Sequence, residues 1–167
     1  MQRLRKNSRL IDSATEAKKY AFKLLGYRLR GIKEMQDRLA LRGYSSEVIA
    51  DVISFLKEKA FVDDNAFAGE LFRNASRRGF GRGGVRDVLL KKGIDKAIVE
   101  ETLAQLTPSE EFDIAVRLME KKAPALFRYS EDERKKRLWR FLMQRGFSKD
   151  TIRKVLKIEL DRQSDEE

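Results

Sequence analysis

The segments LALRGYS (residues 39–45), LLKKGID (residues 89–95) and LMQRGFS (residues 142–148) share one pattern. In each, a basic residue precedes a glycine, an apolar residue follows it, and serine or aspartate comes next. Glycine is favoured where a helix ends in the left-handed conformation, a cation is favourable at the negative end of the helix dipole, and serine or aspartate is a preferred N-cap. Each segment therefore predicts a helix, a tight turn and a second helix. The predicted turn glycines are Gly43, Gly93 and Gly146.

A third helix is predicted before each of these pairs, over residues 14–28, 64–78 and 108–121. The pairs Ser13/Glu16, Thr107/Glu110 and Ser130/Glu133 have the spacing of capping boxes, the last of them at the start of the helix that carries Trp139. Asp63 and Asp64 are the predicted cap of the middle helix. These elements predict an all-α fold, an elongated array of three tandem three-helix repeats. The predicted bounds are a basic N-terminal arm at 1–12, repeats at 13–61, 62–106 and 107–161, and an acidic tail at 162–167.

The composition of the 167 residues excludes several kinds of chemistry. Histidine and cysteine are absent, so there is no disulfide, thiol nucleophile, Cys/His zinc site or histidine base. Asp, Glu, Lys and Tyr show no arrangement that indicates a catalytic pocket, so we expect no enzymatic activity, cofactor or metal. No apolar run approaches the roughly 18 residues of a membrane span. We therefore expect a cytoplasmic protein that does not enter a membrane.

The formal net charge of +10 indicates an anionic partner, and the charge is concentrated locally. Between Arg73 and Lys96 there are 8 basic and 2 acidic residues. Like charges at this density repel, which favours a binding role over an ordinary solvated surface. The predicted partner- or DNA-binding residues on this basic face are Arg73, Arg77, Arg78, Arg82, Arg86, Lys91 and Lys92. Arg3, Arg5 and Lys6 in the N-terminal arm are additional candidate contacts.

Three further motifs have a plainer structural interpretation. The segment GFGRGG (residues 79–84) fits the spacing of a dinucleotide-binding loop, but a helix precedes it where that loop requires a strand. A flexible turn between helices is favoured instead, although glycines also permit close backbone approach. Asp63 and Asp64 offer too few oxygen ligands for a metal. Trp139 lies among basic residues, as in base-stacking sites, but its spacing from Leu142 favours core packing.

The segment FVDDNAFA (residues 61–68) resembles the signature of the RecX family, and the match continues in order from Arg73 to Ile94. The resemblance implies a regulator that binds the RecA–DNA filament, with DNA contacted within that complex. It further implies that the protein mainly inhibits the ATPase, strand-exchange and coprotease activities of RecA. We also expect a monomer. The alternative is a direct DNA- or RNA-binding repeat protein that acts without RecA.

Overall fold

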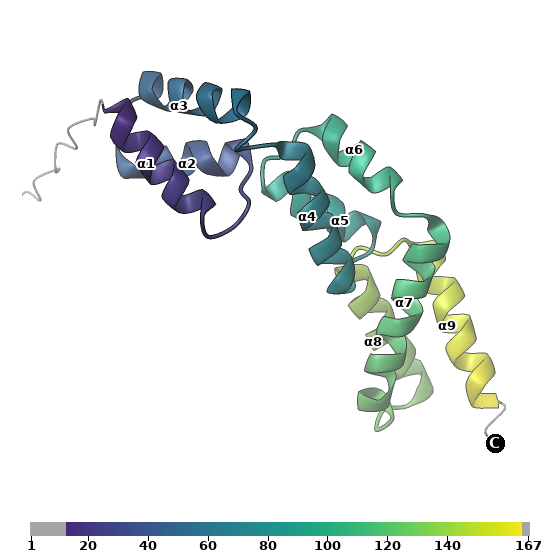
Figure 1. Ribbon diagram of the computed structural model, residues 1–167. Coiled ribbons are helices and arrows are strands. Elements are labelled where there is room, and N and C mark those ends of the chain that lie inside the picture. The colour runs from purple at the N-terminus through teal and green to yellow at the C-terminus, as the bar shows by residue number, and fades with distance from the viewer. Residues whose placement is uncertain (1–12, 165–167) are drawn as a thin grey trace, which may run out of the picture. The chain divides into compact units, whose positions relative to one another are not determined.

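The computed structural model describes residues 13–164, and the regular secondary structure of that part is helical (Figure 1). The prediction of an all-α fold of three-helix repeats is confirmed. The first repeat contains α1 (Ala14–Leu25), α2 (Ile32–Arg42) and α3 (Ser46–Glu58). The second contains α4 (Asp64–Arg77), α5 (Arg82–Lys91) and α6 (Lys96–Ala104). The third contains α7 (Pro108–Lys122), α8 (Glu131–Gln144) and α9 (Lys149–Ser164), with a short 3-10 helix η1 (Ala123–Leu126) after α7.

Two ends differ from the sequence prediction. The first helix stops at Leu25, short of the predicted residue 28, because the chain turns at Gly26 into a loop held by polar contacts. The last helix continues to Ser164, beyond the predicted end of the third repeat at residue 161. The basic arm at 1–12 lies outside the described residues, as do the last three positions of the predicted acidic tail.

The helix caps follow the predicted motifs at α1 and α7 but not at α8. The Ser13 hydroxyl accepts a hydrogen bond from the Glu16 amide at 3.2 Å, and Thr107 and Glu110 form the complete capping box. Ser130 occupies the N-cap position of α8, but its side chain accepts no capping hydrogen bond, so the capping box predicted there is wrong. Three acidic side chains in the first turn of α8 favour that helix end electrostatically instead: Glu131, Asp132 and Glu133.

The described chain divides into two compact units, each with its own apolar core. The first runs to Phe67 and includes Lys92–Ile94, and the second comprises Ala68–Lys91 and the chain from Asp95 onward. The first core includes Met35, Leu39, Val52 and Leu56. The second core includes Met119, Leu138, Leu142, Ile152 and Val155. No helix in residues 13–164 is long and apolar enough to cross a membrane.

One hydrogen bond recurs where a repeat meets the next. The Ile32 amide at the start of α2 donates to Asp64 Oδ1 at 2.8 Å, and the Arg82 amide at the start of α5 donates to Glu111 Oε1 at 2.8 Å. In both cases a carboxylate from the first helix of one repeat caps the second helix of the preceding repeat. The first amides of a helix have no partner within that helix. Each carboxylate therefore accepts a hydrogen bond from such an amide and, by doing so, joins two repeats.

The glycine-rich segment at residues 79–84 is a close-packed joint, so the prediction of a flexible turn is wrong. The Gly81 amide donates to Arg145 O and the Gly83 amide donates to Gly146 O, both at 2.9 Å. A Cβ on Gly84 would lie 2.4 Å from Arg145 O, which is too close for any side chain. The glycines therefore let the backbone of α5 touch the turn between α8 and α9.

Candidate partner-binding groove

A groove runs between α4 and α7 in the second unit. It consists of two hollows of about 470 and 460 Å³, which share Ser76, Arg77, Ile114 and Arg117 in their walls. Apolar side chains line part of it, including Phe72, Leu106 and Leu118. The Ser76 hydroxyl is buried without a hydrogen-bond partner, the one such atom among the side chains described in residues 13–157. A ligand in the groove could satisfy it, since buried polar groups are normally hydrogen-bonded.

Five cations line this groove: Arg73 and Arg77 from α4, Arg78 directly after it, and Arg117 and Lys121 from α7. Arg73 and Arg77 are four residues apart, as are Arg117 and Lys121, so each pair lies on one face of its helix. None of the ion pairs among the described side chains of residues 13–157 involves these five cations. The groove therefore offers positive charge to an anionic partner. Arginine forks match carboxylate and phosphate oxygens alike.

The two hollows differ in charge. The hollow that includes Arg73 carries both signs, because Glu110 and Asp113 also line it. Hydrogen bonds from the backbone amide and the hydroxyl of Thr107 lower the pKa of Glu110, which keeps its carboxylate ionised at neutral pH. The groove thus has a cationic end formed around Arg78 and Lys121 and an end that carries both signs. This pattern suits an oriented partner with an anionic group at one end.

Arg82 does not belong to the exposed basic face that the sequence predicts. Its Nη1 donates to Leu103 O at 2.9 Å and its Nη2 donates to Leu106 O, so the partly buried guanidinium holds the segment between α6 and α7. Arg86 pairs with Glu100, with 2.8 Å between Nη1 and Oε1. The prediction treated both arginines as neighbours on one helix and missed their partners from α6, which are distant in the sequence.

The remaining predicted residues are distributed as follows. Lys91 and Lys92 are exposed at the end of α5, and Lys92 belongs to the first unit, so they are not part of the groove. Arg3, Arg5 and Lys6 lie outside the described residues. The turn glycines Gly43, Gly93 and Gly146 have φ of 95°, 76° and 79°.

Only one of the two predicted caps of α4 caps that helix. Asp63 Oδ1 accepts from the Asn65 amide at 2.8 Å and from the Ala66 amide at 3.4 Å. Asp64 instead accepts from Ile32 and serves the start of α2, so its assignment to α4 is corrected. The start of α2 needs this acceptor because its N-cap, Gly31, has no side chain to provide one.

Arg117 and Lys121 are the groove residues that sequence analysis missed. The third repeat, residues 107–161, holds 14 basic and 10 acidic residues, and this mixture hid a pair of cations four residues apart on the predicted helix at 108–121. The signal that could have found them is the four-residue interval between Arg117 and Lys121. The apolar residues Ile114 and Leu118 beside Arg117 are also four apart, which is helical spacing. Only the packing of α7 beside α4 shows that this pair faces the cations of the second repeat.

Trp139 packs against the core of the third repeat, as predicted, and is only partly buried. It also lines a hollow of about 390 Å³ with Lys135, Lys136, Arg140 and Leu156. Lys135 is paired with Glu131 in the preceding turn. The tryptophan therefore contributes to the core and to a separate, smaller surface feature.

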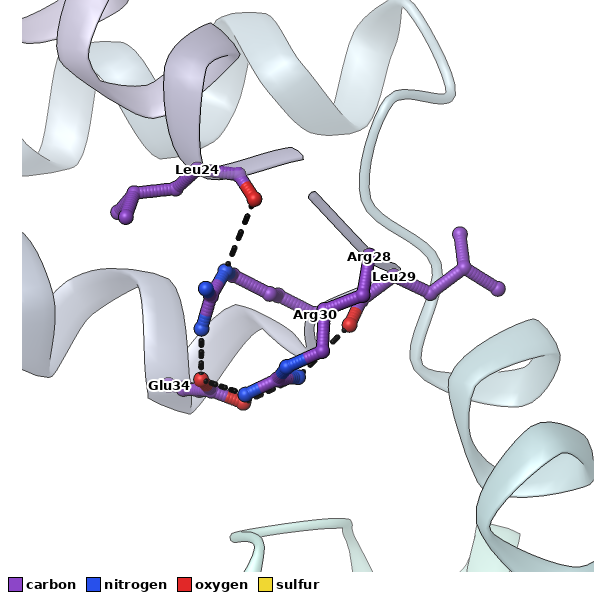
Figure 2. A network of polar contacts seen from close by, with 5 residues as sticks. All are labelled: Leu24, Arg28, Leu29, Arg30 and Glu34. Carbon is purple, nitrogen blue, oxygen red and sulfur yellow. Dashed lines mark hydrogen bonds and ion pairs between the residues drawn. The ribbon is translucent and has the colours of Figure 1, made fainter. Parts of the chain in front are cut away.

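A polar network fixes the loop between α1 and α2 (Figure 2). Arg30 is buried, and its Nε donates to Leu24 O at 3.2 Å while its Nη1 bonds Glu34. Arg28 donates to the same carboxylate and, at 2.9 Å, to Leu29 O. Burial raises the pKa of Glu34, but the hydrogen bond from Arg28 and the charges of Arg28, Arg30 and Lys92 outweigh it and lower the pKa.

Replacing Glu34 with glutamine should destabilise the first unit at pH 7 by about 1–3 kcal/mol, the range for hydrogen bonds to charged groups. Because the folded state lowers the pKa of Glu34, its contribution is present above the ordinary value of 4.5 and is lost as the pH falls through the folded-state pKa. The difference between wild type and variant should therefore shrink at pH 3. Denaturant unfolding at both pH values tests this, with the exposed Asp51→Asn as control. A difference that stays constant between the two pH values would contradict the assignment.

The fold and the groove together define a class: a helical repeat protein with a groove lined by cations. The chain belongs to the RecX family. Models of the first, second and third three-helix domains of RecX match residues 17–56, 63–103 and 109–156. The family is a regulatory one, and the resemblance predicted from the segment FVDDNAFA is confirmed.

Relatives and a solved structure agree with this assignment. The chain is 36% identical over 148 residues to "Regulatory protein RecX" of Pelodictyon phaeoclathratiforme, which covers 88% of this chain and 91% of the relative. It is 34% identical over 145 residues to the protein of the same name from Chlorobium limicola, covering 86% and 89%. The crystal structure of RecX from Lactobacillus salivarius matches with a TM-score of 0.78 at 28% identity, covering 89% of this chain and 96% of that one.

Proposed function

We propose that this chain regulates the RecA recombinase by binding the RecA–DNA filament. In this proposal it lowers the ATPase, strand-exchange and coprotease activities of RecA during DNA repair and recombination. Membership of a regulatory family supports a binding role. The observation that carries the proposal is the α4–α7 groove, in which two successive repeats present five cations that form no ion pair with the described side chains of residues 13–157.

The repeat architecture supports the same proposal. Tandem repeats at 13–61, 62–106 and 107–161 could contact several filament subunits at once, and linked contacts strengthen binding when their spacing matches. The proposal includes a monomeric, cytoplasmic protein without catalytic activity or a cofactor. DNA is contacted within the complex, through groove cations that match phosphate oxygens as well as carboxylates.

Reversing Arg77 and Arg117 to glutamate should abolish most of the inhibition. Each residue lines both hollows, and removing one close charge contact typically costs more than about 1.4 kcal/mol, a tenfold loss of affinity. The measurement is the inhibition of DNA-dependent RecA ATPase, together with co-sedimentation on preformed RecA filaments and on single-stranded DNA alone. We expect at least about a tenfold rise in the concentration needed for half inhibition.

The matched control reverses Arg153 and Lys154, two exposed cations of α9 outside the groove. It changes the net charge by the same amount and should inhibit like the wild type. Equal inhibition by the groove variant and the wild type would remove the groove from the binding site. Tight binding to DNA alone, with no effect on filaments and a steep salt dependence, would favour the alternative of a direct nucleic-acid-binding protein.

A further inference from the structure

Three phenylalanines form a cluster at the surface of the first unit. Phe22 comes from α1, Phe55 from α3, and Phe61 from the segment that follows α3. The ring centroids of Phe22 and Phe61 are 4.9 Å apart with an interplanar angle of 90°, and those of Phe22 and Phe55 are 6.3 Å apart at 89°. Phe22 is nevertheless 40% exposed and Phe61 is 46% exposed. Clustered, exposed aromatic rings mark interaction sites, whereas single exposed apolar residues are ordinary.

The backbone is strained at Ala60, the residue directly before Phe61. Ala60 has φ of 55°, the one non-glycine residue with positive φ in the described part of the chain. The Ala60 amide donates to Lys57 O at 2.9 Å and the Phe61 amide donates to Leu56 O at 2.8 Å, so α3 ends in a turn that normally uses glycine. Alanine is strained in this conformation because of its Cβ, whereas glycine adopts it freely. Strain of this kind tends to persist at functional surfaces, where it presents a particular side chain.

The charges around the cluster indicate the kind of partner. Lys18 Nζ lies 4.1 Å from the centroid of the Phe55 ring, and Lys59 follows Phe55 by four residues. The nearby acid Glu58 is hydrogen-bonded to the Ser54 hydroxyl. Residues 1–61 hold 14 basic and 7 acidic residues, so two copies facing each other through this surface would repel. An apolar surface bordered by cations is complementary to an apolar surface bordered by carboxylates.

The geometry of the rings favours a protein over nucleic acid. Base stacking needs an open aromatic face. Here Lys18 occupies the face of Phe55, and Phe22 meets both other rings edge to face. Edge-to-face aromatic clusters with a cationic border instead resemble the centre of a protein–protein interface, where aromatic anchors are enriched.

We infer that Phe22, Phe55 and Phe61 form a docking surface for a protein whose facing surface is apolar and rimmed by carboxylates. This inference rests on the proposed function for the identity of that protein, the recombinase subunit of the filament. It adds to the cationic groove a second contact of different chemistry. The groove serves charge recognition, while the aromatic cluster contributes apolar burial.

The test places the photoreactive residue p-benzoylphenylalanine at position 22, which keeps an aromatic ring there. The full-length variant is irradiated with preformed RecA filaments on labelled single-stranded DNA. We expect one adduct between this chain and a recombinase subunit. The same photoreactive residue at position 127, where Phe127 is 61% exposed, should give little adduct.

Several outcomes would overturn the inference: an adduct with the labelled DNA, an adduct with a second copy of this chain, or no adduct although the variant co-sediments with filaments. If the wild type itself does not co-sediment, the proposed function fails and this inference falls with it. The two failures are therefore distinguishable.

A second pair of variants tests the cluster without a photoreactive group. Replacing Phe22 and Phe61 together with serine should weaken co-sedimentation with filaments at least about tenfold. Phe127→Ser should leave it unchanged. Circular dichroism confirms that both proteins keep their helices, as expected for positions this exposed. Equal co-sedimentation by all three proteins would overturn the inference.

Discussion

Replacing Gly146 with alanine is expected to destabilise the second unit by about 3–5 kcal/mol. Gly146 has φ of 79°, where a side chain is strained, and a Cβ at this position would lie 1.9 Å from the Gly84 nitrogen. No rotamer relieves that clash, because both groups belong to the backbone. The turn would have to move away from α5, which would also break the hydrogen bonds that Gly81 and Gly83 donate to it.

Gly43→Ala is the matched control for this prediction. Gly43 occupies the equivalent turn in the first repeat and has φ of 95°, but no atom lies within 4 Å of the position of its Cβ. Its substitution should cost only the backbone strain, about 1–2 kcal/mol. Denaturant unfolding followed by circular dichroism measures both variants. Equal losses for the two glycines would show that the contact between repeats contributes nothing beyond the conformation of the turn.

Replacing Arg82 with methionine is expected to cost about 2–3 kcal/mol of stability, the range for hydrogen bonds to a charged group. Methionine keeps an apolar stem of similar length but removes both donors, leaving Leu103 O and Leu106 O without them. Those carbonyls lie at the end of α6 and in the segment before α7, so the loss should loosen the packing of α6 and of that segment against α5. Thermal and denaturant unfolding of the full chain measure the effect.

Arg86→Met is the control, since Arg86 follows on the same helix and the sequence assigns both arginines to one basic face. Its ion pair with Glu100 is exposed, with 43% and 58% of the two side chains accessible. Such surface pairs contribute about 0–1 kcal/mol. A loss at Arg86 equal to that at Arg82 would contradict the structural role assigned to Arg82. Because substituting Arg82 is expected to reduce stability more than substituting Arg86, Arg82 should be avoided in experiments that test binding.

The features predicted correctly from the sequence are those that depend on interactions between residues close together in the chain. The turn glycine Gly43, the capping box at Thr107 and the cap at Asp63 depend on hydrogen bonds between residues a few positions apart. Such contacts can be deduced from spacing alone. The one capping box that failed, at Ser130, has the correct residues, but α8 begins without the hydrogen bond to that hydroxyl.

The candidate site was only partly predictable, because a side chain's availability depends on partners far away in the chain. Arg77 and Arg82 look equivalent in the sequence, yet one lines an open groove and the other bonds carbonyls more than twenty residues away. Arg117 had no sequence signal strong enough to stand out from the other basic and acidic residues of its repeat. The exposed aromatic cluster likewise joins residues of α1 to residues at the end of α3.

The sequence by itself determined that this protein is a tandem array of three-helix units, since helical periodicity, caps and turn glycines are local properties that recur with each repeat. It also excluded histidine and cysteine chemistry outright. Only the tertiary structure decided which charges are free to bind and which hold the repeats together. The physical reason is that Asp64 and Glu111 each accept from a backbone amide of another repeat and Arg82 donates to carbonyls of another helix and of the segment after it, and such pairings exist only once the helices have packed.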